Sequence, residues 1–145
     1  MDVYDVFPLH PQPQPTESLS SYLLRLAAAN RIMTAGRLFR LIFPEDKRNT
    51  NSIADFVPVS FGMLPQVALC PDEQLLQTTF HFLLTRFLKQ KQASIHANFL
   101  ATVLSDELRF CPQCLADTGY YQLAWRFRLL PGCVQHGCHL LDQCP

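Results

Sequence analysis

The sequence is poor in glycine and lacks the short motifs with which enzymes bind nucleotides or activate nucleophiles. Only five glycines occur among 145 residues, so loops that surround phosphate groups are poorly supplied. A P-loop, a dinucleotide-binding glycine motif and a nucleophile elbow are all missing. These absences argue against the common nucleotide-dependent and hydrolytic enzyme classes, and we expect the protein not to be an enzyme.

The sequence also lacks a net charge and a long apolar run. Twelve basic residues balance twelve acidic ones, so no overall attraction draws the chain to nucleic acid or to a membrane surface. No run reaches the roughly 18 apolar residues that span a bilayer, and the acidic, proline-rich start does not resemble a secretory signal. We therefore expect a cytoplasmic protein with no membrane partner, in which thiols stay reduced.

The charges are nevertheless uneven along the chain. Residues 18–49 carry six bases against two acids. Five of these bases lie on or beside a predicted second helix, where they can meet DNA phosphates: Arg31, Arg37, Arg40, Lys47 and Arg48. Arg126 and Arg128 add modest support for DNA binding. An equally good interpretation of the five is the solvated outer face of a helix.

Apolar residues at helical spacing predict two helices near the start of the chain. The first is expected over 17–29, with Thr16 as its N-cap and Asn30 ending it in a left-handed conformation. Thr34 is the expected N-cap of the second helix, which stops before Pro44. Two helices joined by a short turn resemble the opening of a helix-turn-helix, although such hairpins are also common in structural bundles.

Further elements are predicted on both sides of the chain's centre. A proline-rich arm over 1–15 cannot be helical. The widest apolar stripe predicts one long helix over about 71–88, and a shorter helix is expected over 93–104. Alternating apolar and polar residues predict a strand over 121–129, with a short strand over 108–110.

Two short hooks of cysteine and histidine predict a metal site. The first hook is Cys111-Pro112-Gln113-Cys114 and the second is Cys133-Val134-Gln135-His136. Each hook offers two soft or borderline ligands across two intervening residues, which is the pattern of a structural zinc site. Four protein ligands leave no position for water or substrate, so we expect one structural Zn²⁺ held by Cys111, Cys114, Cys133 and His136. A disulfide or a set of buried thiols is the alternative.

Three more candidate ligands follow the second hook, namely Cys138, His139 and Cys144. A short helix is expected to start at 139–141, and neighbouring side chains on a helix do not converge on one ion. Cys138 and His139 are therefore expected to take no part in metal binding. The pair Cys144-Pro145 repeats the opening of the first hook, which indicates either a free thiol or a second metal hook that is cut off here.

Together these patterns predict a mainly α protein in three parts. The parts are the arm over 1–15, a helical, helix-turn-helix-like domain over 16–107, and a small zinc-ribbon or treble-clef-type module over 108–145. The apolar faces of the helices and the neutral charge favour protein partners over strong DNA binding.

Two blocks carry a family resemblance. They are Pro-Thr-Glu-Ser-Leu-Ser-Ser-Tyr-Leu-Leu-Arg-Leu-Ala-Ala-Ala-Asn over 15–30, and the segment 110–145 with both hooks. In sequence and order they resemble the TniQ/TnsD family of transposon target-selection proteins. The resemblance implies an N-terminal helix-turn-helix followed by zinc modules, with Cys111, Cys114, Cys133 and His136 as the first zinc ligands. The sequence departs from the family in stopping at Cys144-Pro145, where a second zinc motif usually begins.

The resemblance also implies a role and partners. Such proteins mark a target site for transposition and recruit an AAA+ ATPase regulator, which brings the transposase. Some members recognise an attachment sequence in DNA, and others join a CRISPR effector complex as head-to-tail dimers. We therefore expect a non-catalytic adaptor whose partners are the regulator, DNA, a CRISPR effector or a second copy of the chain. The alternative is a stand-alone transcription regulator with a helix-turn-helix and a zinc ribbon.

Overall fold

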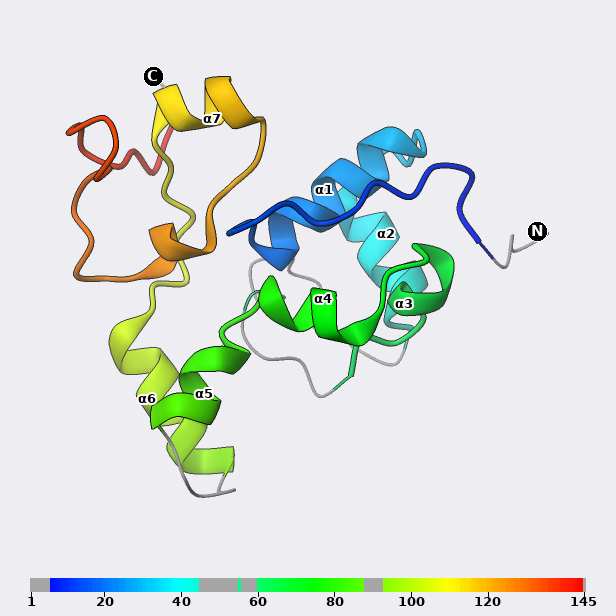
Figure 1. Ribbon diagram of the computed structural model, residues 1–145, viewed down its shortest axis with the longest axis horizontal. Coiled ribbons are helices and arrows are strands. Elements are labelled where there is room, and N and C mark those ends of the chain that lie inside the picture. Colours follow the sequence, from blue (N-terminus) through cyan, green and yellow to red (C-terminus); the bar gives the residue numbers. More distant parts are fainter. Residues whose placement is uncertain (1–5, 45–54, 56–59, 88–92, 145) are drawn as a thin grey trace.

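The computed structural model describes residues 6–44, 55, 60–87 and 93–144. Within these ranges the chain is mainly helical, and its β-structure is limited to isolated bridges. The mainly α class predicted from the sequence is therefore confirmed. The elements, labelled in Figure 1, are α1 (Leu19–Ala29), α2 (Ala35–Ile42), α3 (Leu64–Val67), α4 (Asp72–Gln77), α5 (His81–Phe87), α6 (Ala93–Val103), α7 (Pro112–Thr118) and a 3₁₀ helix (Leu123–Arg126).

Helix α1 is present as predicted, with different caps. Ser18 rather than Thr16 is its N-cap, because the Ser18 hydroxyl accepts a hydrogen bond from the backbone N–H of Ser21 at 3.2 Å. At the other end, Asn30 has a φ of −94° and is not left-handed. The left-handed residue is Arg31, with a φ of 55°. Thr16 and Asn30 therefore have roles other than the predicted ones.

Helix α2 packs against α1 and begins as predicted. The Thr34 side chain accepts a hydrogen bond from the backbone N–H of Arg37 at 3.1 Å. The C-terminal end of α2 is closely approached by a turn at Gly62, which has a φ of 55°. A Cβ atom at this glycine would lie 2.4 Å from the carbonyl oxygen of Ile42, so only glycine fits both the conformation and the space.

The largest apolar core lies among α1, α2, α3 and α4 (Figure 1). Each helix contributes fully buried leucine side chains, among them Leu23, Leu38, Leu64 and Leu75. Burying a side chain of this size stabilises the fold by roughly 1.5–3 kcal/mol. Cys70 is also fully buried in this core, as expected for a small apolar residue.

Residues 6–15 contain no helix and run alongside α1, where Figure 1 draws them in dark blue. Asn30 holds this arm by two hydrogen bonds. Its amide oxygen accepts from the backbone N–H of Leu9 at 3.0 Å, and its amide nitrogen donates to the Leu9 carbonyl at 2.6 Å. Further along, the backbone N–H of Phe7 donates to the Val67 carbonyl at 2.8 Å. The first five residues of the predicted arm lie outside the described ranges.

The single helix predicted over 71–88 is wrong, since the chain forms two helices, α4 and α5, in the part that the structure describes. The break lies at Thr78, whose hydroxyl donates to the Leu75 carbonyl at 2.6 Å. The carbonyl of Thr78 accepts from the backbone N–H of Leu19 at 2.8 Å, at the start of α1. Threonine hydroxyls compete with helical hydrogen bonding in this way, and the contact with α1 fixes the break in place.

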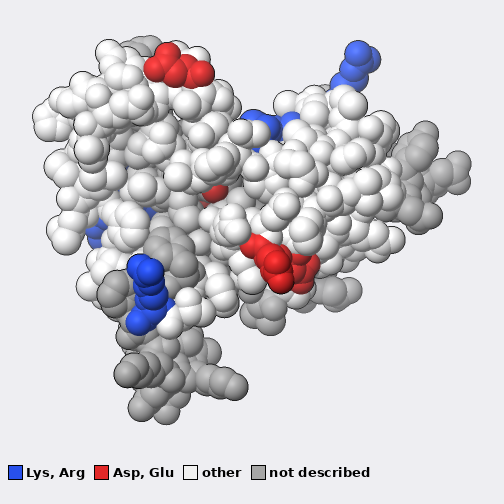
Figure 2. Space-filling model, viewed as in Figure 1, with Lys and Arg blue, Asp and Glu red and all other residues white. Residues whose placement is uncertain are grey.

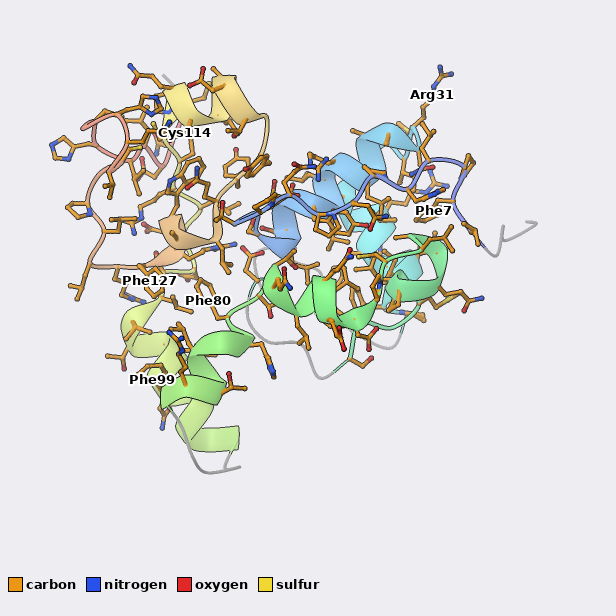
Figure 3. The ribbon with its side chains drawn as sticks, in the orientation of Figure 1. Phe7, Arg31, Phe80, Phe99, Cys114 and Phe127 are labelled. Carbon is orange, nitrogen blue, oxygen red and sulfur yellow. The ribbon has the colours of Figure 1, made fainter. Side chains whose placement is uncertain are left out.

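A second apolar cluster joins α5 and α6 to the C-terminal region (Figure 3). Phe80 is fully buried and meets Phe127 edge to face, with ring centroids 5.5 Å apart. Leu100 and Leu104 complete the cluster from the side of α6. The helix predicted over 93–104 is confirmed as α6.

The extended elements predicted for the C-terminal region are wrong. The segment 121–129 contains a 3₁₀ helix instead of a strand, and 108–110 contributes only a bridge from Phe110 to Leu141. The helix expected at 139–141 is replaced by bridged, extended residues. The alternating pattern failed because Trp125 and its neighbour Arg126 are both buried, and a polar partner for an arginine cannot be inferred from a hydrophobicity pattern.

Among the helices of the described residues, none combines the length and apolar character needed to traverse a membrane.

Candidate metal centre

The first hook forms the start of α7. Cys111 is the N-cap, and its sulfur accepts a hydrogen bond from the backbone N–H of Cys114 at 3.4 Å. Pro112 occupies the first turn, where proline is favoured because its missing N–H would have no helical partner. Gly119, with a φ of 74°, ends the helix in the left-handed conformation. This short helix places the sulfurs of both cysteines on one side.

The second hook is a turn with the same hydrogen-bond arrangement. The sulfur of Cys133 accepts from the backbone N–H of His136 at 3.4 Å. The carbonyl of Cys133 accepts from the N–H of Gly137 at 2.8 Å, and this glycine has a φ of 64°. In both hooks the first ligand is therefore fixed by an N–H three residues later.

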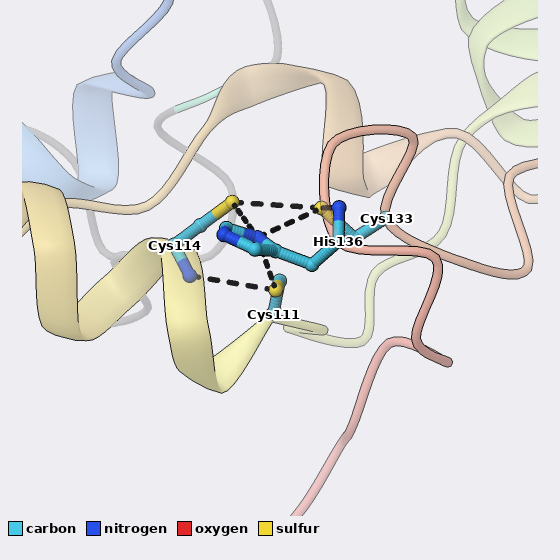
Figure 4. A group of neighbouring side chains, drawn as sticks. All are labelled: Cys111, Cys114, Cys133 and His136. Carbon is cyan, nitrogen blue, oxygen red and sulfur yellow. Dashed lines mark hydrogen bonds between the residues drawn. The ribbon is translucent and has the colours of Figure 1, made fainter.

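The structure brings the four predicted ligands together (Figure 4). Their ligand atoms all lie within 4.8 Å of one another, and the three cysteines are buried. The Nδ1 atom of His136 faces the sulfurs of Cys114, Cys111 and Cys133 at 3.2, 3.5 and 3.6 Å. The sulfurs of Cys114 and Cys133 are 3.5 Å apart.

These distances fit a tetrahedral ion. Ligand atoms at the usual bond lengths to Zn²⁺ lie about 3.8 Å apart for two sulfurs and about 3.6 Å apart for a sulfur and a nitrogen. Three sulfurs and one imidazole nitrogen also form a soft donor set of the kind that zinc selects. The four residues can therefore bind one metal ion, with every tetrahedral position filled by protein.

The thiols of the site differ in pKa. Burial raises the pKa of the Cys111 thiol, but the N–H of Cys114 and the neighbouring thiols outweigh burial and bring the value to about 7. The pKa of Cys133 is lowered by a similar balance, in which the N–H of His136 opposes burial. Burial and the adjacent sulfurs raise the pKa of Cys114 to about 12. A cation among the sulfurs would favour all three thiolates, since the thiolate is the form that binds metal.

Asp117 lies behind His136, on the side away from the sulfurs. Its carboxylate is 3.6 Å from the Nε2 atom of His136. Because Nδ1 faces the sulfurs, Nε2 is the nitrogen that carries the proton when a metal is bound, and a carboxylate beside it orients the ring. The sequence analysis missed this residue, although its place one turn after the first hook on α7 could have indicated it.

Aromatic residues cover the candidate metal site. Trp125 is 3% exposed and packs with the three ligand cysteines. Tyr121 meets it edge to face at a centroid distance of 6.0 Å, and Phe110 meets Tyr121 at 6.1 Å. Arg109 braces the connection between the hooks by donating to the backbone carbonyls of Trp125, Phe127 and Leu130.

A buried ion pair joins this region to the N-terminal helices. The Nε and a terminal nitrogen of Arg126 each lie 2.9 Å from a carboxylate oxygen of Asp55. The same carboxylate accepts from the backbone N–H and the hydroxyl of Ser20, on α1, at 2.6 and 2.8 Å. Sequence reasoning could not find Asp55, because nothing in its local pattern indicates a partner 71 positions away.

The start of the segment 15–30 also makes buried polar contacts. Glu17 is fully buried, and its carboxylate accepts from Arg25 Nε and a terminal nitrogen, both at 2.7 Å. Ser21 donates to Glu17 at 3.0 Å and accepts from the backbone N–H of Tyr121 at 2.9 Å. Backbone hydrogen bonds from Ser18 to Tyr121 and from Leu123 to Thr16 cross the predicted boundary between 107 and 108.

The predicted DNA-binding arginines separate into two groups. Arg31, Arg37 and Arg40 are exposed, and Figure 3 shows Arg31 pointing away from the molecule beyond α1. Arg126 is buried on Asp55 and serves an internal contact. Arg128 is exposed, although its Nε donates to the Leu104 carbonyl at 2.7 Å. Lys47 and Arg48 lie outside the described residues. Figure 2 shows small, separate groups of charge on an otherwise uncharged face.

The fold and the site together define a mainly helical protein with a candidate metal centre of three cysteines and one histidine. The TniQ family model matches residues 8–140, so the chain belongs to the TniQ family. Membership indicates involvement in the selection of transposition targets, and the family is generally non-catalytic. A comparison with curated proteins found no match.

Proposed function

We propose that this chain is a non-catalytic adaptor in target-site selection for DNA transposition. It links target DNA or a CRISPR effector complex to an AAA+ ATPase regulator, and a second copy of the chain is a further partner. The observation that carries the proposal is the family match over residues 8–140, nearly the whole chain. The partners themselves follow from the resemblance of segments 15–30 and 110–145 to proteins with this role.

We assign Zn²⁺ as the metal of the site and give it a structural role. Three sulfurs and one imidazole nitrogen suit zinc, and four protein ligands leave no position for water or substrate. A bound ion would crosslink α7 to the turn of the second hook. The closed ligand set supports the non-catalytic part of the proposal.

The exposed side of the helical hairpin is the proposed DNA contact. Arg31, Arg37 and Arg40 are exposed. Arg25 is not available for DNA in the same way, because it forms an ion pair with the buried Glu17. Three cations can meet phosphates without reading bases, so we expect weak binding that falls as salt rises. Weak contact with DNA suits an adaptor that obtains its position from a partner.

The proposal is tested by mixing the purified chain with the AAA+ regulator of its own transposon, in the presence of DNA and nucleotide. We expect the two proteins to elute together from a sizing column. The variant Arg37→Glu/Arg40→Glu should bind DNA less well and should still form the complex with the regulator. Failure of the unmodified chain to form any complex with the regulator would contradict the adaptor role.

The same preparation separates the adaptor from a stand-alone transcription regulator. The isolated chain is titrated with random DNA and with selected DNA at rising salt. Tight, sequence-selective binding that survives at about 200 mM salt would favour the transcription regulator. Binding without sequence preference that disappears over this range agrees with the adaptor.

A further inference from the structure

A fifth sulfur lies beside the four predicted ligands. The Sγ of Cys138 is 3.4 Å from the Sγ of Cys111, almost the same as the 3.5 Å between Cys114 and Cys133. Two sulfurs bound to one tetrahedral Zn²⁺ lie about 3.8 Å apart. Cys138 is therefore at ligand spacing from Cys111, although it does not belong to the group whose atoms are all mutually close.

The backbone holds Cys138 in this position. Its carbonyl oxygen accepts from the N–H of Cys133 at 2.7 Å, and Gly132 pairs with His139 in an antiparallel bridge. A Cβ atom on Gly132 would lie 2.9 Å from the Cys138 carbonyl oxygen, so the two segments approach this closely because residue 132 is glycine. Cys138 is half-buried, whereas Cys144 is exposed.

The expectation that Cys138 takes no part depended on a helix that is not there. Side chains of residues 138 and 139 would diverge on a helix, and in an extended segment they point to opposite sides. His139 is exposed, and Cys138 faces Cys111. The divergence of the two side chains therefore excludes only a site that uses both residues, and it does not exclude Cys138 alone.

We propose that Cys138 is a reserve ligand of the metal centre. While His136 binds the ion, the Cys138 thiol donates a hydrogen bond to the Cys111 thiolate. This hydrogen bond stabilises the negative charge that three neighbouring thiolates bring together. When His136 is lost, Cys138 releases its proton to water and its thiolate forms a metal–sulfur bond in the fourth position. No electrons are transferred in this exchange. The inference rests on the proposed binding of Zn²⁺ by the first four residues.

The test uses Co²⁺ as a spectroscopic probe in the full chain. We compare the unmodified chain, His136→Ala, His136→Ala/Cys138→Ser and, as a matched control, His136→Ala/Cys144→Ser. The single variant should bind one Co²⁺, with sulfur-to-cobalt absorption higher than in the unmodified chain in the ratio of four thiolates to three. Removing Cys138 as well should weaken binding by at least about 100-fold, since a lost ligand exceeds the loss of an outer partner. The Cys144 control should match the single variant.

Two outcomes would overturn the inference. One is equal affinity of His136→Ala and His136→Ala/Cys138→Ser. The other is loss of binding in the Cys144 control, which would assign the fourth position to Cys144. Failure of the unmodified chain to bind Co²⁺ or Zn²⁺ would instead contradict the metal site itself, so the two failures are distinguishable.

A second measurement does not require the His136 variant to fold without metal. Cys138→Ala in the otherwise unmodified chain should bind Zn²⁺ about 10-fold more weakly, with an unchanged ligand-field spectrum of Co²⁺, because alanine removes only the hydrogen bond that the Cys138 thiol donates to Cys111. Unchanged affinity would contradict the hydrogen-bonding role. Alkylation of Cys138 by iodoacetamide should also be slower in metal-loaded His136→Ala than in the metal-loaded unmodified chain, and an equal or faster rate would contradict ligation.

Discussion

The N-terminal helices and the C-terminal region of this protein are stabilised in different ways. Helices α1 to α4 bury a continuous core of leucine and other apolar side chains. Residues 108–144 contain one seven-residue helix and a 3₁₀ helix, and their buried cluster consists of Trp125 and three cysteines. A region with so small a core generally needs a disulfide or a metal ion to fold. This comparison predicts that the metal ion contributes strongly to the stability of residues 108–144 and very little to that of helices α1 to α4.

The junction between the two regions is polar where each region is apolar. Asp55 receives hydrogen bonds from Ser20 on α1 and from Arg126 beside the metal site. Burial raises the pKa of the Asp55 carboxyl, and the Arg126 charge and Ser20 oppose that rise. Such a pair is sensitive to geometry, because removing one partner leaves the other buried without compensation. The position of the metal region on the helices therefore depends on a few specific contacts.

The largest effect is expected from Cys114→Ser, which removes a ligand from the metal site. The variant should lose its metal and with it much of the folding energy that structural zinc supplies, on the order of 10–16 kcal/mol in zinc-finger peptides. Trp125 is the single tryptophan, and its fluorescence should shift to the red because the side chain becomes exposed to water. The helical circular dichroism signal of the N-terminal helices should persist. Cys144→Ser, at an exposed thiol, is the control and should change neither. Metal that is retained both in Cys114→Ser and in Cys114→Ser/Cys138→Ser would contradict the assignment of ligands.

The next largest effect is expected from Asp55→Ala at the junction. Breaking a buried ion pair by removing one partner destabilises a protein by about 3–5 kcal/mol. Urea unfolding should show this loss, whereas Asp142→Ala, at an exposed position, should be nearly neutral. Replacing both partners, as in Asp55→Ala/Arg126→Met, should recover part of the stability. A loss below about 1 kcal/mol for Asp55→Ala would mean that the junction is not stabilised by this pair.

Two glycines of the helical part allow a sharper test of its packing. Gly62→Ala should destabilise the protein by about 1–3 kcal/mol, since alanine is strained at its φ of 55° and a Cβ would clash with the Ile42 carbonyl. Gly36 in α2 has nothing within 4 Å of its Cβ position. Gly36→Ala should therefore stabilise the protein by about 0.5 kcal/mol. Thermal melts followed at 222 nm measure both, and effects of the same sign would contradict this account of α2.

The smallest effect is expected outside the ligand set, at Asp117. Asp117→Asn removes the negative charge that orients His136, so we expect zinc affinity to fall by about 10-fold, the lower end of the range for outer-shell partners, because this side chain is largely exposed. Competition with a chromophoric chelator measures the change. Asp142→Asn provides an exposed control of the same chemistry. Equal zinc affinities in the two variants would contradict the role of Asp117 in orienting His136.

Much of the local helical structure could be predicted from the sequence. The α1–α2 hairpin, the Thr34 cap and α6 follow from spacing and capping residues, because such signals act over a few positions. The two metal hooks could be identified for the same reason, because each places its two ligands only three positions apart. Their convergence across 19 positions, from Cys114 to Cys133, could be expected because a tetrahedral ion requires it.

Two of the failures share a physical cause, because the outcome depends on a partner distant in sequence. The break at Thr78 is fixed by the backbone of Leu19, and burial of Arg126 is decided by Asp55. Arg25, the sixth base of residues 18–49, forms an ion pair with Glu17, eight positions earlier in the chain. Cys138 was set aside because a helix was expected where the chain is extended. Hydrophobicity patterns describe an element's faces and do not identify such partners.

The most direct test of the difference between the two regions is hydrogen exchange of the full chain, compared with and without its metal. Removing the ion with a chelator should sharply raise exchange in residues 108–144 and leave α1 and α2 (19–42) nearly unchanged. Restoring Zn²⁺ should return the original protection. Equal loss of protection in both regions, or no change in residues 108–144, would contradict a C-terminal region that depends on its ion and a helical region that does not.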